Sequence, residues 1–92
     1  MLAPTLKGGV PIVSRCVHAA NVREGDIAEG LTAIQARYPS LDIGSYPYFR
    51  DARPGVAIVA KGTDASAAEE AIGDVTIMFK AIGVQPVAGE PA

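Results

Sequence analysis

The side chains best suited to chemistry in this sequence gather between residues 44 and 53. Tyr46 and Tyr48 alternate along an apparent strand, and Arg50 and Arg53 follow at once. Aromatic faces and guanidinium groups together suit stacking on a base or a nucleotide. We therefore select six ligand or interface candidates: Ser45, Tyr46, Tyr48, Arg50, Arg53 and Lys61. The alternative, which we favour, is that the rings pack against the sheet, a neighbouring domain or another subunit.

Cys16 and His18 are the single cysteine and the single histidine of the chain. Two residues apart on a predicted strand, they share one face. A thiol–imidazole nucleophile also needs in-line geometry and a third orienting group, which neighbouring positions on one strand seldom provide. One cysteine forms neither an internal disulfide nor a cysteine-based metal cluster. The sequence thus predicts no catalytic residue, no metal site and no cofactor, with Cys16 a small buried hydrophobe.

Carboxylates fall at the starts of two predicted helices. Asp26-x-x-Glu29 and Ser66-x-x-Glu69 each have the spacing of a capping box. The Gly-Thr-Asp segment before the second helix matches neither a Walker A loop nor a GxGxxG loop. A carboxylate at Asp64 would repel a phosphate, so we interpret Asp64 or Ser66 as a plain helix cap. None of these groups forms the carboxylate pair that general acid–base catalysis requires.

The bulk composition is that of one globular domain. The 92 residues are 49% hydrophobic and 20% charged, which excludes a largely disordered chain and leaves room for a single core. The net charge of −2 is spread along the chain with mixed signs, whereas binding to duplex DNA needs a clustered basic face. No Gly-x-x-Gly occurs, and KH domains clamp RNA with that loop. We therefore do not expect a nucleic acid partner.

Targeting signals and chain ends also shape the expectations. No apolar run approaches the roughly 18 residues of a membrane-spanning helix, and the first residues lack the apolar stretch of a secretory signal. With the single cysteine, these observations predict a cytoplasmic protein and no membrane partner. Residues 1–10 resemble a linker or the tail of a preceding domain, 11–84 a single α+β domain, and 85–92 a flexible C-terminal tail.

Two segments show helical periodicity. The first covers 24–38, ends before a proline, and has one apolar stripe that consists of Ile27, Leu31, Ile34 and Tyr38. The second follows Ser66 and has a stripe that consists of Ala68, Ile72, Val75, Phe79 and Ile82. Gly83 is placed to be the residue that ends this helix in the left-handed conformation.

Strand-forming residues fill the remaining segments. Strands are predicted over 11–20, 41–49 and 56–61, and a short last strand over 84–88. Pro47 cannot donate to a ladder, so its strand either lies at a sheet edge or ends at Tyr46. The order is β-α-β-β-α, with a further β optional, and each helix has one apolar side. Both helices must then cover one face of a three- or four-stranded sheet, in a two-layer α+β sandwich of ferredoxin-like or KH-like character.

Several segments together resemble the CinA-like, molybdopterin-binding-domain proteins. The resemblance covers about residues 2–83 and is carried by 38–49, 56–59 and 62–64, with 27–31 fitting the family's first helix and 2–9 the tail of its preceding domain. Its most specific part is the run from Ile43 to Phe49. In that family a MoaB/MogA-type domain is followed by a small KH-like α+β domain.

The resemblance implies an accessory role. In the bacterial proteins of this family, the pterin- or nucleotide-binding residues belong mainly to the MoaB/MogA-type domain. The present chain is then a non-catalytic C-terminal accessory domain, not an enzyme by itself, and its partner is the preceding MoaB/MogA-type domain, with self-association as a further expectation. The alternative is a stand-alone small-ligand or single-stranded RNA binding module that uses residues 46–53.

Overall fold

The chain folds in the order β-α-β-β-α-β in the computed structural model, which describes residues 11–50 and 52–89. The elements are β1 (Val13–Ala20), α1 (Glu24–Arg37), β2 (Asp42–Arg50), β3 (Arg53–Gly62), α2 (Ala65–Ala81) and β4 (Pro86–Ala88). Each lies within a few residues of its predicted position. The largest difference is at β3, which begins three residues before the predicted 56 because only two residues separate it from β2.

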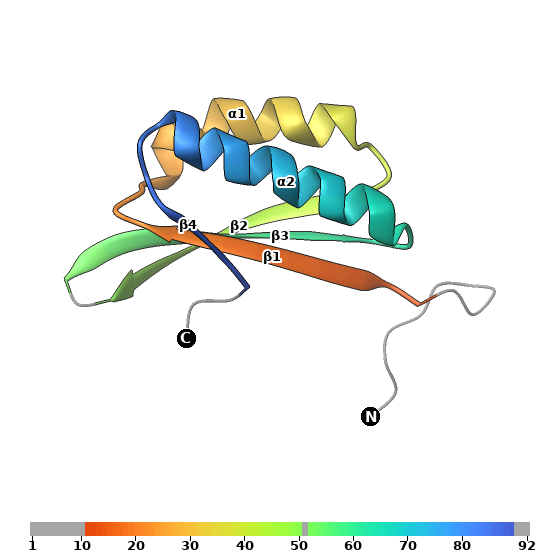
Figure 1. Cartoon of the computed structure of the whole chain (residues 1–92), viewed down its shortest axis with the longest axis horizontal. Coiled ribbons are helices and arrows are strands. Elements are labelled where there is room, and N and C mark those ends of the chain that lie inside the picture. The colour runs from red at the N-terminus through yellow and green to blue at the C-terminus, as the bar shows by residue number, and fades with distance from the viewer. Residues whose placement is uncertain (1–10, 51, 90–92) are drawn as a thin grey trace.

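The strands form one antiparallel sheet in the order β2-β3-β1-β4, and both helices cover one of its faces (Figure 1). This confirms the predicted two-layer α+β sandwich and adds its fourth strand. β2 and β3 pair as the predicted hairpin, from Asp42 opposite Lys61 to Arg50 opposite Arg53. Of the two arrangements considered, the element order is the ferredoxin-like one.

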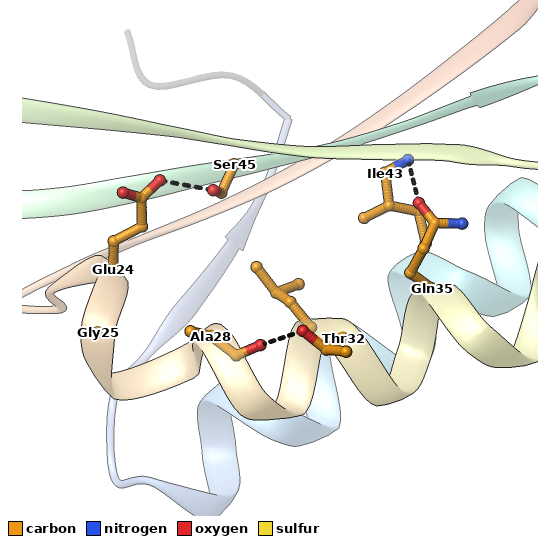
Figure 2. A pocket seen from close by; sticks show the side chains of 8 residues that line it. Glu24, Gly25, Ala28, Thr32, Gln35, Ile43 and Ser45 are labelled. Carbon is orange, nitrogen blue, oxygen red and sulfur yellow. Dashed lines mark hydrogen bonds between the residues drawn. The ribbon is translucent and has the colours of Figure 1, made fainter.

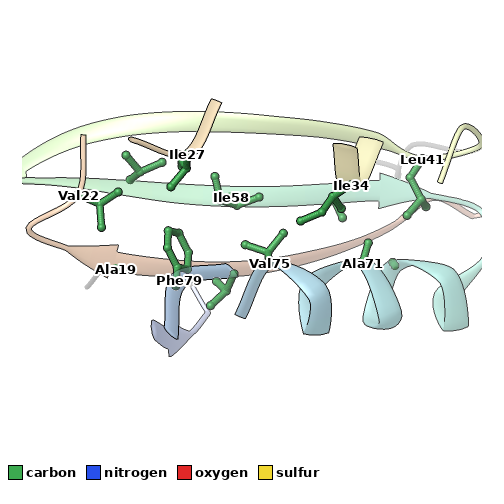
Figure 3. Close-up of a cluster of buried hydrophobic side chains, with 13 residues drawn as sticks. Ala19, Val22, Ile27, Ile34, Leu41, Ile58, Ala71, Val75 and Phe79 are labelled. Carbon is green, nitrogen blue, oxygen red and sulfur yellow. The ribbon is translucent and has the colours of Figure 1, made fainter. Parts of the chain in front are cut away.

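The core lies between the helices and the two central strands (Figure 3). Its largest fully buried side chains are Phe79, Ile27, Ile58, Val22, Val56 and Val75. Both predicted stripes contribute to it, and burial of each large apolar side chain stabilises the fold by roughly 1.5–3 kcal/mol. The stripe prediction is wrong for Ile82, which follows the end of α2 and is 44% exposed. The chain turns there, because Gly83 adopts a φ of 85° as predicted.

The helix starts differ from the predicted capping boxes. Arg23 precedes α1, and the backbone N–H of Arg23 donates a hydrogen bond to the carboxylate of Asp26 at 3.3 Å. Asp26 is therefore the third helical residue instead of the cap. At α2 the cap is Asp64, whose carboxylate accepts from the N–H of Ala67 at 3.2 Å. The box predicted to begin at Ser66 is wrong, because α2 already begins at Ala65 and Ser66 is its second residue, whereas Asp64, the other predicted cap, does cap the helix.

β2 is an edge strand, as Pro47 predicts, although its pairing continues to Arg50 and does not stop at Tyr46. The N–H of Ile43 points away from β3 and donates to Gln35 Oε1 at 3.0 Å. In an antiparallel ladder alternate residues point the same way, so the nitrogen of Pro47 also faces the edge. The N–H of Ile43 is already hydrogen-bonded and Pro47 has no N–H, so this edge has fewer donors available for pairing with another chain.

β4 extends the domain beyond the predicted boundary at residue 84. It pairs with β1 from Val17 opposite Ala88 to Ala19 opposite Pro86, and the N–H of Gly89 donates to the carbonyl of Cys16 at 2.9 Å. Residues 86–88 therefore belong to the sheet, because β1 offers them a free edge. The predicted linker at 1–10 and the end of the predicted tail at 90–92 lie outside the described residues. Neither described helix has the length and apolar character needed to cross a membrane.

Candidate functional site

The sheet face that points away from the helices is the candidate site, and we call it the open face. The opposite face is closed by the core, because Val17, Val56 and Ile58 are buried against the helices. Strand register then assigns the alternate residues to the open face. Its main side chains are Ser14, Cys16 and His18 from β1, Tyr46, Tyr48 and Arg50 from β2, and Arg53, Val59 and Lys61 from β3.

Five of the six residues selected from the sequence share this face, and Ser45 does not. Ser45 lies on the helix side of β2, where its hydroxyl donates to Glu24 Oε2 at 2.6 Å (Figure 2). It fastens the start of α1 to the edge strand. The other five are brought together by the β2–β3 hairpin, although Lys61 stands opposite Asp42 at the end of the hairpin far from the arginines. Their role in binding stays a prediction.

The two tyrosines of the open face lie over glycines. A Cβ on Gly55 would overlap Tyr48 Cζ, and one on Gly44 would lie 3.1 Å from the Tyr46 hydroxyl. The rings therefore pack against the sheet at two glycines, where a residue with a Cβ would displace them. Tyr46 remains 51% exposed, while Tyr48 is half-buried. Tyr46 and Tyr48 thus form a shallow aromatic surface that rests directly on the backbone of the sheet.

His18 joins this surface from the neighbouring strand. Its ring meets Tyr48 edge to face, with centroids 6.2 Å apart at 71°. Its Nδ1 lies 2.7 Å from the carbonyl oxygen of Gly89, so in the neutral ring that nitrogen carries the proton. His18 thus connects β1 to Tyr48 of β2 and to Gly89, the residue that follows β4. Cys16 is half-buried on the same face, instead of buried as the sequence suggests, because neither of the two described helices covers this side of β1 (Figure 1).

The open face contains a shallow groove of about 540 Å³. It is lined by aromatic, small apolar and polar side chains together, including Tyr46, Tyr48, Cys16, Val59 and Lys61. Its size lies within the range of small-ligand sites. Across residues 11–50 and 52–89, no group of three or more His, Cys, Asp or Glu is arranged to hold a metal ion. The side chains that line the groove offer stacking on the rings of Tyr46 and Tyr48 and contact with the ammonium group of Lys61.

A second groove, also of about 540 Å³, runs between α1 and the edge of β2 (Figure 2). Gln35 organises it: Nε2 donates to the carbonyls of Tyr38 at 3.1 Å and Leu41 at 2.8 Å, while Oε1 accepts from Ile43. Sequence reasoning missed this residue, because only a folded loop brings its three partners together. The N–H of Ile43 on this side of β2 already donates to Gln35. We therefore interpret the second groove as a structural feature and prefer the open face as the functional site.

Tyr38 and Asp74 connect the two helices. The Tyr38 hydroxyl donates to Asp74 Oδ2 at 2.8 Å, and Arg37 Nη2 lies 3.4 Å from the same oxygen. The hydrogen bond to Asp74 is the main reason that the pKa of Tyr38 is raised, and desolvation adds to it. The pair is a structural contact between helices, away from the open face.

The raised pKa of Tyr38 predicts a pH dependence of stability. The unfolded chain releases this proton first, so the contribution of Tyr38 is complete below its unfolded pKa of about 10 and is lost as pH rises above it. We expect the free energy of unfolding of wild type to exceed that of Tyr38→Phe at pH 8, and the difference to shrink above pH 10. Urea unfolding of both proteins over this range measures it. A difference that stays constant or grows would contradict the assignment.

These features define a small ferredoxin-like α+β domain with an open face that carries aromatic and basic side chains. The chain belongs to the family described as FAD synthase, middle domain, which matches residues 11–88. That family differs from the CinA-like proteins that the sequence resembles, and the CinA-like resemblance stays a prediction. No curated protein sequence matches the chain.

Solved structures similar to this chain show the fold alone. The de novo designed protein Foldit4 has a TM-score of 0.61 at 12% identity, over 88% of this chain and 99% of that one. The de novo designed protein Ferredog-Diesel has 0.49 at 12%, over 98% and 95%. The intact alpha subunit of aIF2 from Pyrococcus abyssi has 0.42 at 18%, over 88% and 34%. The likeness to Foldit4 supports the β-α-β-β-α-β architecture.

Proposed function

We propose that the chain is a non-catalytic accessory domain of a larger cytoplasmic protein, and that its open face packs against a neighbouring nucleotide- or pterin-binding domain. The observation that carries the proposal is that none of the described elements covers the open face (Figure 1). Tyr46, Tyr48 and Val59 lie there, and apolar surface gathered in one patch marks interaction sites. Exposed tyrosine and arginine are also the residue types enriched at interfaces.

The family description supports a multidomain setting. This domain is described as the middle one of FAD synthase, and a middle domain has neighbours in its own chain. The CinA-like resemblance would make one neighbour a MoaB/MogA-type domain. The non-catalytic role is supported by the use that the fold makes of His18, which holds Tyr48 and Gly89 in place.

Thiol labelling of Cys16 tests the proposed docking. Cys16 lies in the groove of the open face, so a partner that covers the face should slow its reaction. We expect at least tenfold slower labelling in the complete polypeptide that the gene encodes than in the 92-residue chain, measured by mass spectrometry of the Cys16 peptide. The control is Ile77→Cys on α2, where the native side chain is 66% exposed and labelling should be equal in both proteins.

Three outcomes would contradict this function. Equal labelling of Cys16 in both proteins would show that the open face is not covered. A reading frame that encodes no further domain would remove the proposed neighbour. Hydrolysis of a dinucleotide by the 92-residue chain, abolished by Arg50→Ala, would make it an enzyme.

A second candidate function is a small-ligand or single-stranded RNA binding module. The observation that favours it is the groove that combines Tyr46 and Tyr48 with Lys61, since aromatic faces beside cations suit stacked bases. Titration with mononucleotides and short oligonucleotides, followed by tyrosine fluorescence, separates the two functions. A saturable change would favour the binding module, and its absence at millimolar ligand would remove this candidate.

A further inference from the structure

Two arginines face each other at the end of the β2–β3 hairpin. Arg50 is directly opposite Arg53, at the last pair before the turn, and both side chains are exposed. Opposite residues of an antiparallel pair have Cβ atoms about 4.5–5.5 Å apart, so both guanidinium groups can reach one ligand. The end of the hairpin projects beyond the helices (Figure 1). The pair is therefore accessible from the open face and from the end of the molecule.

This arrangement does not favour folding. Like charges directly opposite each other destabilise a sheet, and within residues 11–50 and 52–89 the ion pairs involve Arg15 and Arg37 but neither hairpin arginine. Beside them, Ala52 adopts a φ of 62°, a conformation that L-residues other than Asn and Asp seldom adopt. Phe49, next to Arg50, is 72% exposed. Features that lower stability persist where recognition requires them.

The chemistry of the pair indicates a phosphate. A guanidinium group is a planar fork of N–H donors that binds phosphate oxygens in pairs, and two forks from opposite strands can share one phosphate group. Tyr48 lies two residues from Arg50 on the same face, about 7 Å along the strand, which leaves room for a sugar between a stacked base and the phosphate. Lys61 is eight residues from Arg53, about 27 Å along the strand, and is too far to join.

We propose that Arg50 and Arg53 form a phosphate-binding clasp at the end of the hairpin, which takes the phosphate group of a nucleoside phosphate with its base on Tyr48. The inference deepens the open-face site and rests on that face being a binding surface. It concerns the ligand of the hairpin end, whereas docking of the open face is tested separately through Cys16.

Thermal unfolding of the 92-residue chain tests the clasp with pyrophosphate as the probe, against sodium chloride at equal ionic strength. We expect pyrophosphate to raise the midpoint of wild type and to bind Arg53→Gln at least tenfold more weakly. Without ligand, Arg53→Gln should unfold at a higher temperature than wild type, because the charge repulsion is gone. Lys80→Gln, which removes an exposed cation of α2, is the matched control and should keep the response of wild type.

Several outcomes would overturn the clasp. One is an equal response to pyrophosphate in wild type and Arg53→Gln, and another is a lower midpoint of Arg53→Gln without ligand. ADP should bind at least as tightly as pyrophosphate, and adenosine that binds as tightly as ADP would show that the base alone carries the affinity. An acidic peptide that saturates the arginines when pyrophosphate does not would assign the hairpin end to a protein partner. None of these results depends on whether Cys16 is covered in the complete polypeptide.

Discussion

Phe79→Ala is expected to lower the free energy of unfolding by about 3–5 kcal/mol, because it leaves a cavity at the centre of the fold. Phe79 is fully buried and is the largest of the fully buried side chains, in the cluster between α2 and the sheet (Figure 3). A domain of this size has a total stability of about 5–15 kcal/mol, so a large share would be lost. Urea unfolding followed by circular dichroism measures the change.

The other phenylalanine is a matched control. Phe49 is 72% exposed, so Phe49→Ala should change the free energy of unfolding by no more than about 0.5 kcal/mol, as surface substitutions usually do. Equal losses in the two variants would show that the burial of Phe79 is not what stabilises the domain. A loss below about 1 kcal/mol for Phe79→Ala would contradict its central place in the core.

The layered fold follows from periodicity, and Phe79 illustrates why. Its spacing from Val75 and Ala68 on a 3.6-residue repeat predicts a buried stripe, and all three are buried. Period-two alternation likewise predicts that Tyr46 and Tyr48 share a face of a strand. These predictions succeed because a single geometric period and the burial of apolar surface determine them.

Features that depend on competition between neighbours were not predictable in this way. Asp64 and Ser66 are both good cap residues, and the choice of Asp64 depends on where the chain leaves β3. The same limit applies to Ser45, whose partner Glu24 comes from the start of α1. Alternation places Ser45 opposite the tyrosines, but only the position of the helices shows which of the two faces is open.

No motif or periodicity in the sequence indicates the role of Gln35. After Phe79→Ala, we expect the loss of Gln35 to have the second largest effect on the free energy of unfolding. Gln35→Leu should lower the free energy of unfolding by about 2–3 kcal/mol, since it leaves the carbonyl of Leu41 and the N–H of Ile43 without their side-chain partner. The carbonyl of Tyr38 loses one of two donors and keeps the N–H of Leu41 at 3.0 Å. Leucine and glutamine have similar helix propensities, so α1 itself should be little affected. Denaturant unfolding gives the value.

The same substitution should also promote self-association. Gln35 accepts the edge N–H of Ile43, and removing it opens a stretch of β2 to pairing with the edge of another chain. Sedimentation velocity at increasing concentration should show more association for Gln35→Leu than for wild type. The control is Gln85→Leu, at an exposed position outside the helices and strands, which should match wild type in both experiments. If Gln35→Leu associated no more than Gln85→Leu, the edge of β2 would be protected by Pro47 and the twist of the strand without the help of Gln35.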